Sequence, residues 1–201
     1  MRQKFCIHCG VELSRGTSSL DHVPSKCLLQ RPFPPNLQTV RICKACNHRF
    51  SDDEEYFAAF LGLLLSDGET ESVRSLELAI SSNHLIQDNL TDNISVDNDS
   101  KVPRLWIEPD NEKLQAVILK NALSHALLGG SIAFCAENAA VNMCAFDVIP
   151  ENHREQLFGI SNDWITVQTG IYRYRLLTSG NVMVRSVLYE YLACEVIFSR
   201  T

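Results

Sequence analysis

Long apolar runs are missing from this chain of 201 residues. No stretch approaches the roughly 20 apolar residues that a membrane-spanning helix needs. The first ten residues, MRQKFCIHCG, also lack the apolar segment of a secretory signal peptide. These absences argue against a membrane protein and against export, so we expect a cytoplasmic protein.

Internal repeats and low-complexity segments are absent too, which excludes a solenoid and a wholly disordered chain. With 45% hydrophobic residues, the chain has enough apolar material for a globular core. The eight cysteines are numerous for a cytoplasmic protein. Because that compartment keeps thiols reduced, metal binding is a better explanation for paired cysteines than disulfides are.

Four of the cysteines form two CxxC pairs, Cys6 with Cys9 and Cys43 with Cys46. Two such pairs, separated by the 33 residues from 10 to 42, suit a closed tetrahedral zinc site. A redox dithiol is the alternative, but redox proteins of the thioredoxin type use a single CxxC beside a βαβ pattern, which this sequence does not show. The sequence therefore predicts a structural Zn²⁺ held by four thiolates.

Charge is divided unevenly along the chain. Residues 1–50 hold eight Lys and Arg side chains against two acidic ones, a net charge of +6, and the remaining residues carry −12. A basic segment on an acidic body fits a module that touches phosphate groups.

The N-terminal part predicts strands followed by a helix. Apolar and polar residues nearly alternate over 37–42, which favours a short strand. Ser51 and the acidic residues behind it are suited to a helix start, and residues 56–65 supply an apolar helix body.

The remainder predicts a connector and a second folded part. Turn-forming Asn and Asp crowd residues 66–103. Asp110 can cap a helix over 111–128 that stops at Gly129 and Gly130. Strand-forming residues then fill three later segments, 164–168, 171–177 and 181–187. The last segment, 189–198, suits a strand or a short helix.

An Asp-His pair and two asparagines complete a recognisable pattern with the cysteines. In chain order its elements read CIHC (Cys6 to Cys9), LDHVP (Leu20 to Pro24), PNLQTV (Pro35 to Val40) and CKACN (Cys43 to Asn47). This order and spacing resemble the HNH endonuclease family in its zinc-stapled form. The likeness covers about a quarter of the chain, and its specificity comes from the whole set, since a lone CxxC or Asp-His is a weak signal.

The resemblance implies a role for each polar residue of the pattern. His22 would be the general base that takes a proton from water, and Asn36 would orient it. Asp21 and Asn47 would hold a catalytic Mg²⁺ or Mn²⁺ against the phosphate. His48 is an alternative ligand to Asn47.

Phosphate binding departs from the family pattern. The family often has a Lys three residues after this Asn, where the chain has Phe50. Contacts to nucleic-acid phosphates would then fall to Arg41, Lys44 and Arg49.

The fold class predicted from these features is α+β. It comprises an HNH nuclease finger of the ββα-metal type over residues 1–65, a connector over 66–103 and a separate α+β domain over 104–201. The expected function is hydrolysis of DNA phosphodiester bonds, with RNA left open. By family-level analogy, the setting would be a bacterial defence system in which a partner protein licenses cleavage.

Two other function classes stay open. The finger could bind nucleic acid or protein without cutting, or the acidic part could dock a protein partner through residues 104–201 with the finger as an accessory. Oligomeric state is not indicated.

Overall fold

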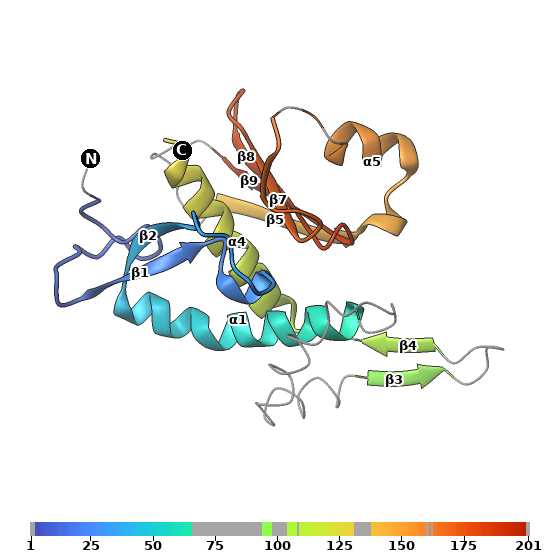
Figure 1. Ribbon diagram of the computed structural model, residues 1–201, viewed down its shortest axis with the longest axis horizontal. Coiled ribbons are helices and arrows are strands. Elements are labelled where there is room, and N and C mark those ends of the chain that lie inside the picture. The colour runs from blue at the N-terminus through green and yellow to red at the C-terminus, as the bar shows by residue number, and fades with distance from the viewer. Residues whose placement is uncertain are drawn as a thin grey trace.

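The computed structural model describes residues 3–65, 94–97, 104–107, 109–130, 138–159, 161 and 163–199. The chain has a mixed α+β fold, as predicted (Figure 1). No helix among these residues is long and apolar enough to cross a bilayer.

The N-terminal part is an antiparallel hairpin followed directly by a long helix. Strands β1 (Ser18–Val23) and β2 (Gln38–Cys43) pair residue for residue, and the short 3-10 turn η1 (Lys26–Leu28) lies between them. Helix α1 (Lys44–Leu65) continues from β2 without a loop. The strand expected over 37–42 is thus confirmed.

The predicted start of that helix at Ser51 is wrong. Helix α1 begins at Lys44, directly after Cys43. The sulfur of Cys43 accepts a hydrogen bond from the Cys46 backbone N–H at 3.3 Å, which is the bond that a capping oxygen normally accepts. The second cysteine pair therefore starts the helix, and Ser51 lies inside it.

The C-terminal part is a five-stranded antiparallel sheet in the order β5-β9-β8-β7-β6. Three of its strands confirm the predicted segments, and 189–198 forms a strand rather than a helix. A first strand and a short helix were not predicted. The elements are β5 (Ala139–Ala145), η4 (Phe146–Val148), α5 (Glu151–Phe158), β6 (Ile165–Gln168), β7 (Tyr172–Leu177), β8 (Val182–Leu188) and β9 (Leu192–Phe198).

Helix α4 (Asn111–Leu128) lies between the two parts, with α1 and the hairpin on one side and the sheet on the other (Figure 1). Its bounds match the prediction. The Asp110 side chain accepts from the Lys113 backbone N–H at 3.3 Å, and the helix ends at Gly129.

One cluster of buried side chains draws on both parts of the chain. Tyr56, Phe57 and Leu61 of α1 pack in it together with residues of α4 and with Tyr172 and Phe198 of the sheet. The residues on either side of the predicted connector therefore share one core. Within 66–103 the structure describes only strand β3 (Ile94–Asp97), which pairs with β4 (Arg104–Ile107); the rest of the predicted connector lies outside the described residues.

Alternation along β7 gives the sheet two different faces. Tyr172 belongs to the core beside α4, whereas Arg173 and Arg175 lie on the opposite face, against α5. Their guanidinium groups donate to the carbonyls of Phe158 and Leu157 at 2.9 and 2.6 Å. These bonds satisfy carbonyls at the end of α5 that have no partner within the helix.

His125 of α4 is sealed in the core between two tyrosines. Its ring stacks on Tyr174 with centroids 3.6 Å apart, and its Nε2 lies 3.1 Å from the Tyr172 hydroxyl. Nδ1 is buried and has no hydrogen-bond partner. Burial lowers the pKa of His125 to about 3, so the folded protein holds a neutral ring.

We expect His125 to make the fold sensitive to acid. Between pH 6.5 and about 3 the unfolded chain takes up a proton on this ring and the folded protein does not. Stability is therefore fully present above pH 6.5 and falls as the pH drops, by about 1.4 kcal/mol per pH unit from this group. In urea unfolding at pH 7 and pH 5, His125→Gln should lose less stability on acidification than the parent chain. His153→Gln, on an exposed position of α5, is the control, and equal losses in all three proteins would contradict the prediction.

Candidate functional site

The first cysteine pair lies in a tight turn ahead of β1. The Cys6 backbone N–H donates to the Val11 carbonyl at 2.8 Å, and the Gly10 N–H donates to the Cys6 carbonyl at 2.8 Å. Gly10 has φ of +70°, a left-handed conformation that favours glycine at this point of the turn. The turn brings the Cys6 and Cys9 thiols to the same side.

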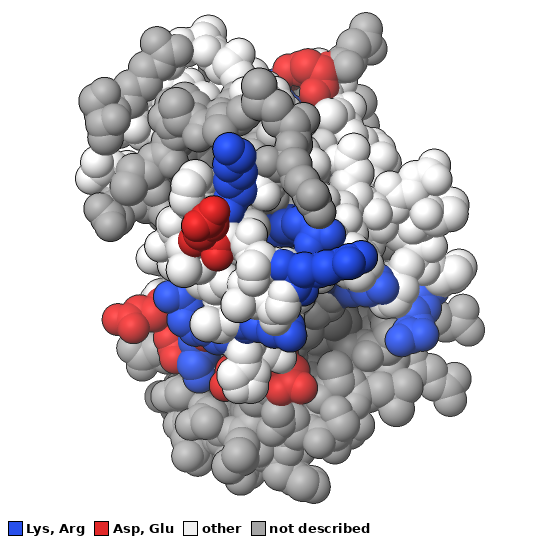
Figure 2. Space-filling view, turned by 90° about the vertical axis from the view of Figure 1, so that its left-hand side faces the viewer, with Lys and Arg blue, Asp and Glu red and all other residues white. Residues whose placement is uncertain are grey.

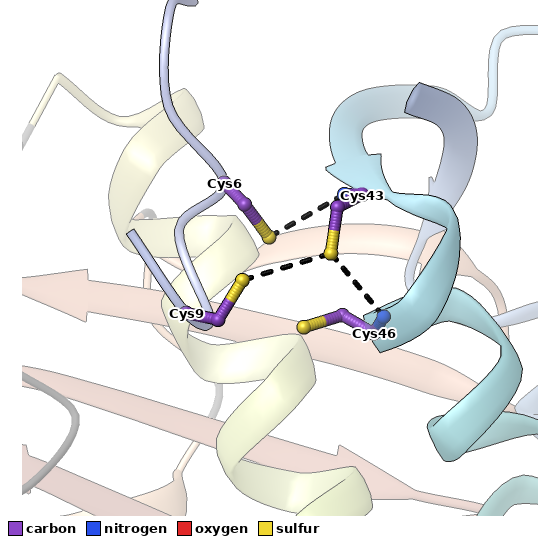
Figure 3. Close-up of side chains that lie close together, drawn as sticks. All are labelled: Cys6, Cys9, Cys43 and Cys46. Carbon is purple, nitrogen blue, oxygen red and sulfur yellow. Dashed lines mark hydrogen bonds between the residues drawn. The ribbon is translucent and has the colours of Figure 1, made fainter. Parts of the chain in front are cut away.

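The second pair spans the junction of β2 and α1, and it faces the first (Figure 3). The four sulfurs lie within 4.8 Å of one another, and the sulfurs of Cys9 and Cys43 are 3.6 Å apart. Sulfurs around a tetrahedral zinc with bonds of about 2.3 Å stand about 3.8 Å apart. Cys6, Cys9, Cys43 and Cys46 could therefore hold a metal ion such as zinc.

The electrostatics of this group also suit a metal. Burial opposes ionisation of Cys43, but hydrogen bonds from the Cys46 backbone and from the neighbouring thiols outweigh it and lower the pKa of Cys43 to about 7. Burial raises the pKa of Cys46, and its thiol neighbours raise it further. Four such thiols cannot all ionise together unless a cation replaces their protons.

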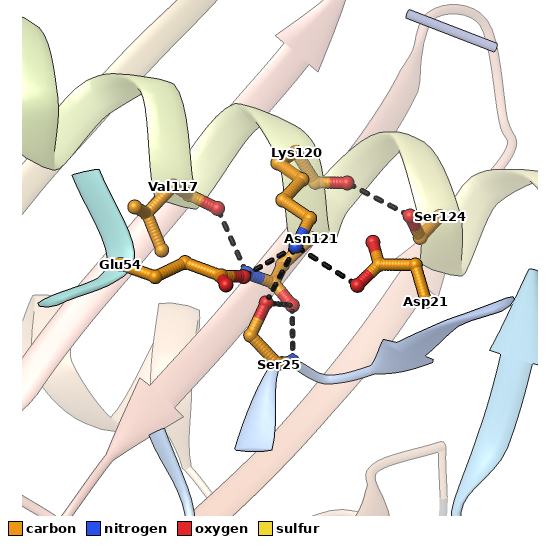
Figure 4. Close-up of polar contacts among 7 residues, drawn as sticks. All are labelled: Asp21, Ser25, Glu54, Val117, Lys120, Asn121 and Ser124. Atoms are coloured by element: carbon orange, nitrogen blue, oxygen red, sulfur yellow. Dashed lines mark hydrogen bonds and ion pairs between the residues drawn. The ribbon is translucent and has the colours of Figure 1, made fainter. Parts of the chain in front are cut away.

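Asp21 lies on the buried face of β1, where it meets a lysine from α4 (Figure 4). The Lys120 ammonium donates to Asp21 Oδ1 at 3.0 Å and to the Ser25 hydroxyl at 3.2 Å, and it also pairs with Glu54. Only 2% of the Lys120 residue is exposed. Burial disfavours its charge, but Glu54 and Asp21 raise the pKa of Lys120 above its ordinary value, so it is an ammonium ion at neutral pH.

His22 lies on the other face of the same strand. Strand β1 is regular, with Asp21 opposite Val40 and His22 opposite Thr39, so neighbouring side chains point to opposite faces. His22 is half-buried. Burial and the nearby Lys26 lower the pKa of His22, and its ring is therefore a proton acceptor at neutral pH. The structure does not bring Asp21 and His22 to a common face.

The two asparagines lie at exposed positions. Asn36 is in the loop before β2, and Asn47 follows Cys46 in the first turn of α1, with His48 exposed beside it. Among the described residues, the four cysteines form the one group of three or more His, Cys, Asp or Glu side chains close enough to share a metal. Of the two ligands expected for the divalent cation, Asp21 is thus buried and Asn47 is exposed.

Basic side chains gather on the N-terminal part of the molecule, which contains the cysteines and the hairpin. Figure 2 shows Lys and Arg on that face. The predicted phosphate contacts Arg41, Lys44 and Arg49 are all exposed. Glu12 is the one exposed acidic side chain in residues 3–50. The exposed basic residues of this range are Lys4, Arg15, Lys26, Arg31, Arg41, Lys44 and Arg49.

Lys120 and its partner Glu54 are missing from the sequence-based prediction of the site. That prediction includes Glu54 among the acidic residues of a helix start, and Lys120 falls within the helix predicted over 111–128 without a role of its own. A signal was present, because Lys120, Asn121, Ser124 and His125 interrupt the otherwise apolar part of the helix from Ala116 to Leu128, and all four are buried. Buried polar residues so close together generally need partners from other elements.

Comparison of the chain with protein-family models, with curated proteins and with solved structures finds no match.

Proposed function

We propose that this protein is a zinc-stapled endonuclease of the HNH type that hydrolyses nucleic-acid phosphodiester bonds, with DNA as the substrate. The observation that carries the proposal is the cluster of four cysteines at the junction of an antiparallel hairpin and a helix, with the Asp-His pair on the hairpin's first strand. The zinc would be structural, since four thiolates leave no open position for a substrate.

His22 carries the chemistry in this proposal. Its ring is partly exposed, and its lowered pKa keeps it unprotonated at neutral pH, as a general base requires. The exposed Arg41, Lys44 and Arg49 would bind the phosphate backbone and hold a strand over this face.

The expected Mg²⁺ or Mn²⁺ at Asp21 does not fit the described arrangement. The Lys120 ammonium occupies Asp21 Oδ1, and Oδ2 is buried without a hydrogen-bond partner. No described contact joins Asp21 to Asn47. Because the ammonium already neutralises the Asp21 carboxylate and would repel a divalent ion beside it, the proposal rests on His22 and the basic surface.

Plasmid cleavage by purified zinc-loaded protein tests the proposal. We expect supercoiled DNA to be nicked or linearised when Mg²⁺ or Mn²⁺ is supplied and to stay intact with a chelator. His22→Ala should lose at least about 100-fold of this activity, because a general base contributes that much or more. His153→Ala, far along the chain on α5, should cleave like the parent protein. A folded, zinc-loaded parent that leaves the plasmid intact, or a His22→Ala variant that cuts normally, would count against the nuclease.

A zinc-held nucleic-acid binding module that does not cut is the second candidate. The burial of Asp21 under Lys120 favours it, because this carboxylate is then part of the interior rather than of an open site. Both candidates would bind DNA in a salt-dependent manner, and only the nuclease would cleave the plasmid.

Docking of a protein partner through residues 104–201 alone is harder to reconcile with the packing. Tyr56, Phe57 and Leu61 of α1 are buried against that part. A chain without residues 1–60 would expose the apolar surface that they cover, so the shared core argues for one cooperative unit.

A further inference from the structure

The Lys120 ammonium occupies a position that is built for a cation. Three oxygens surround its nitrogen, from the carboxylates of Asp21 and Glu54 and the hydroxyl of Ser25 (Figure 4). Two carboxylates and a neutral oxygen are the kind of ligands that Mg²⁺ and Mn²⁺ also take. The side chain thus stands among the oxygens that a divalent ion would use.

The lysine is held in this position by the surrounding structure. Asn121, the next residue of α4, accepts from the Ser25 backbone N–H at 2.8 Å and donates to the Val117 carbonyl at 2.8 Å. These bonds tie the segment after β1 to the helix turn that carries Lys120. The ammonium also lies over the Phe50 ring, 5.4 Å from its centroid, so a cation–π contact adds to the three oxygens.

A second cation cannot share these oxygens with the ammonium. Like charges a few ångströms apart in a partly desolvated site repel strongly. Withdrawal of the lysine would leave its own charge among the apolar residues of α4, which is unfavourable. The lysine and a divalent ion are therefore competitors for Asp21.

We propose that Lys120 is the resident cation of the Asp21 site, that the folded protein does not bind a divalent ion there, and that an uncharged residue at position 120 would turn Asp21 and Glu54 into a divalent-cation site. This proposal bears on cleavage only through the proposed function, because the resemblance to HNH nucleases implies that this aspartate is a metal ligand. Lys120 then neutralises Asp21 in the interior of the fold.

Paramagnetic broadening by Mn²⁺ tests this on the full chain. The ¹⁵N-labelled, zinc-loaded protein is titrated with Mn²⁺, and zinc content is measured before and after. We expect the amides of residues 20–25 and 119–122 to stay sharp in the parent protein. In Lys120→Met, or in Lys120→Gln if that variant is better folded, the same amides should broaden at Mn²⁺ concentrations at least tenfold lower. Adding Asp21→Asn to that variant should abolish the effect.

Broadening centred on Asp21 in the parent protein would overturn the proposal, as would a folded Lys120 variant without an Asp21-dependent site. If neither Lys120 variant folds, the presence or absence of broadening near Asp21 in the parent protein still decides whether the folded protein binds a divalent ion there. The broadening does not depend on cleavage. A plasmid assay without cleavage would therefore contradict the nuclease proposal and would not affect the proposal for Lys120.

Discussion

Replacing Cys43 by serine should abolish zinc binding and strongly destabilise the whole fold. Cys43 joins the two cysteine pairs, since its sulfur lies 3.6 Å from that of Cys9 and caps α1 through the Cys46 N–H. Structural zinc contributes about 10–16 kcal/mol to the folding of small metal-held modules. Zinc content by elemental analysis should fall from one ion per chain to none, and the thermal unfolding transition should shift down or disappear.

The size of this effect follows from the small core around the four cysteines. Seven residues form the buried cluster between the cysteine turn, the hairpin and the start of α1, and three of them are cysteines. The other four are Val23, Val40, Ile42 and Phe50. Burying four apolar side chains stabilises by about 1.5–3 kcal/mol each at most, which does not outweigh the entropy of ordering more than 40 residues.

Cys144→Ser is the matched control for this experiment. Cys144 is a half-buried cysteine of β5 outside the metal group, so its replacement should leave zinc content unchanged and shift stability only modestly. If Cys43→Ser kept its zinc, or lost it and remained as stable as Cys144→Ser, the four cysteines would not form a structural metal site.

Replacing Lys120 by methionine should cost about 3–5 kcal/mol of unfolding free energy, the usual penalty when one partner of a buried ion pair is removed. Methionine fits the space of the lysine stem but leaves Asp21 and Glu54 facing each other without a counter-ion. Chemical denaturation at pH 7 measures the loss. At pH values low enough to protonate the carboxylates, the variant should recover part of it.

Lys113→Met provides the comparison on the same helix. Lys113 pairs with Asp110 at 3.6 Å, and its side chain is 36% exposed. An exposed pair of this kind contributes less than about 1 kcal/mol. A Lys120→Met variant that also carries Asp21→Asn and Glu54→Gln should be more stable than Lys120→Met alone, because the excess negative charge is gone. Equal costs for the two lysine variants would mean that the Lys120 pair is effectively solvated.

Local sequence patterns predicted those features of the structure that residues close together in the chain determine. The spacing of Cys6, Cys9, Cys43 and Cys46 predicted a metal group because each pair lies within one turn. Asp110 and Gly129 marked the two ends of α4 through bonds made within four residues of each end. The strands predicted over 171–177 and 181–187 also formed, as β7 and β8, and Gly180 between them has φ of +89°, which suits a turn.

Contacts between distant segments could not be predicted in this way. Asp21 and Lys120 are 99 residues apart, and nothing in either local pattern names the other. Strand β5 was missed because its sequence, AAVNMCA, is rich in small residues and gains its conformation from pairing with β9. The start of α1 was wrong because a sulfur takes the place of the hydroxyl that marks a helix start in most sequences.

The separation of Asp21 from Lys120 along the chain also sets an order of events during synthesis on the ribosome. All four cysteines have been made by residue 46, so zinc can bind before α4 exists. At about 5–20 residues per second, Lys120 follows Asp21 by about 5–20 s. We expect a nascent chain in this interval to hold its metal while Asp21 still lacks its counter-ion and Phe57 and Leu61 still face water. Chaperones would bind this folding intermediate, in which the cysteine turn has folded around its metal and α4 has not yet been synthesised.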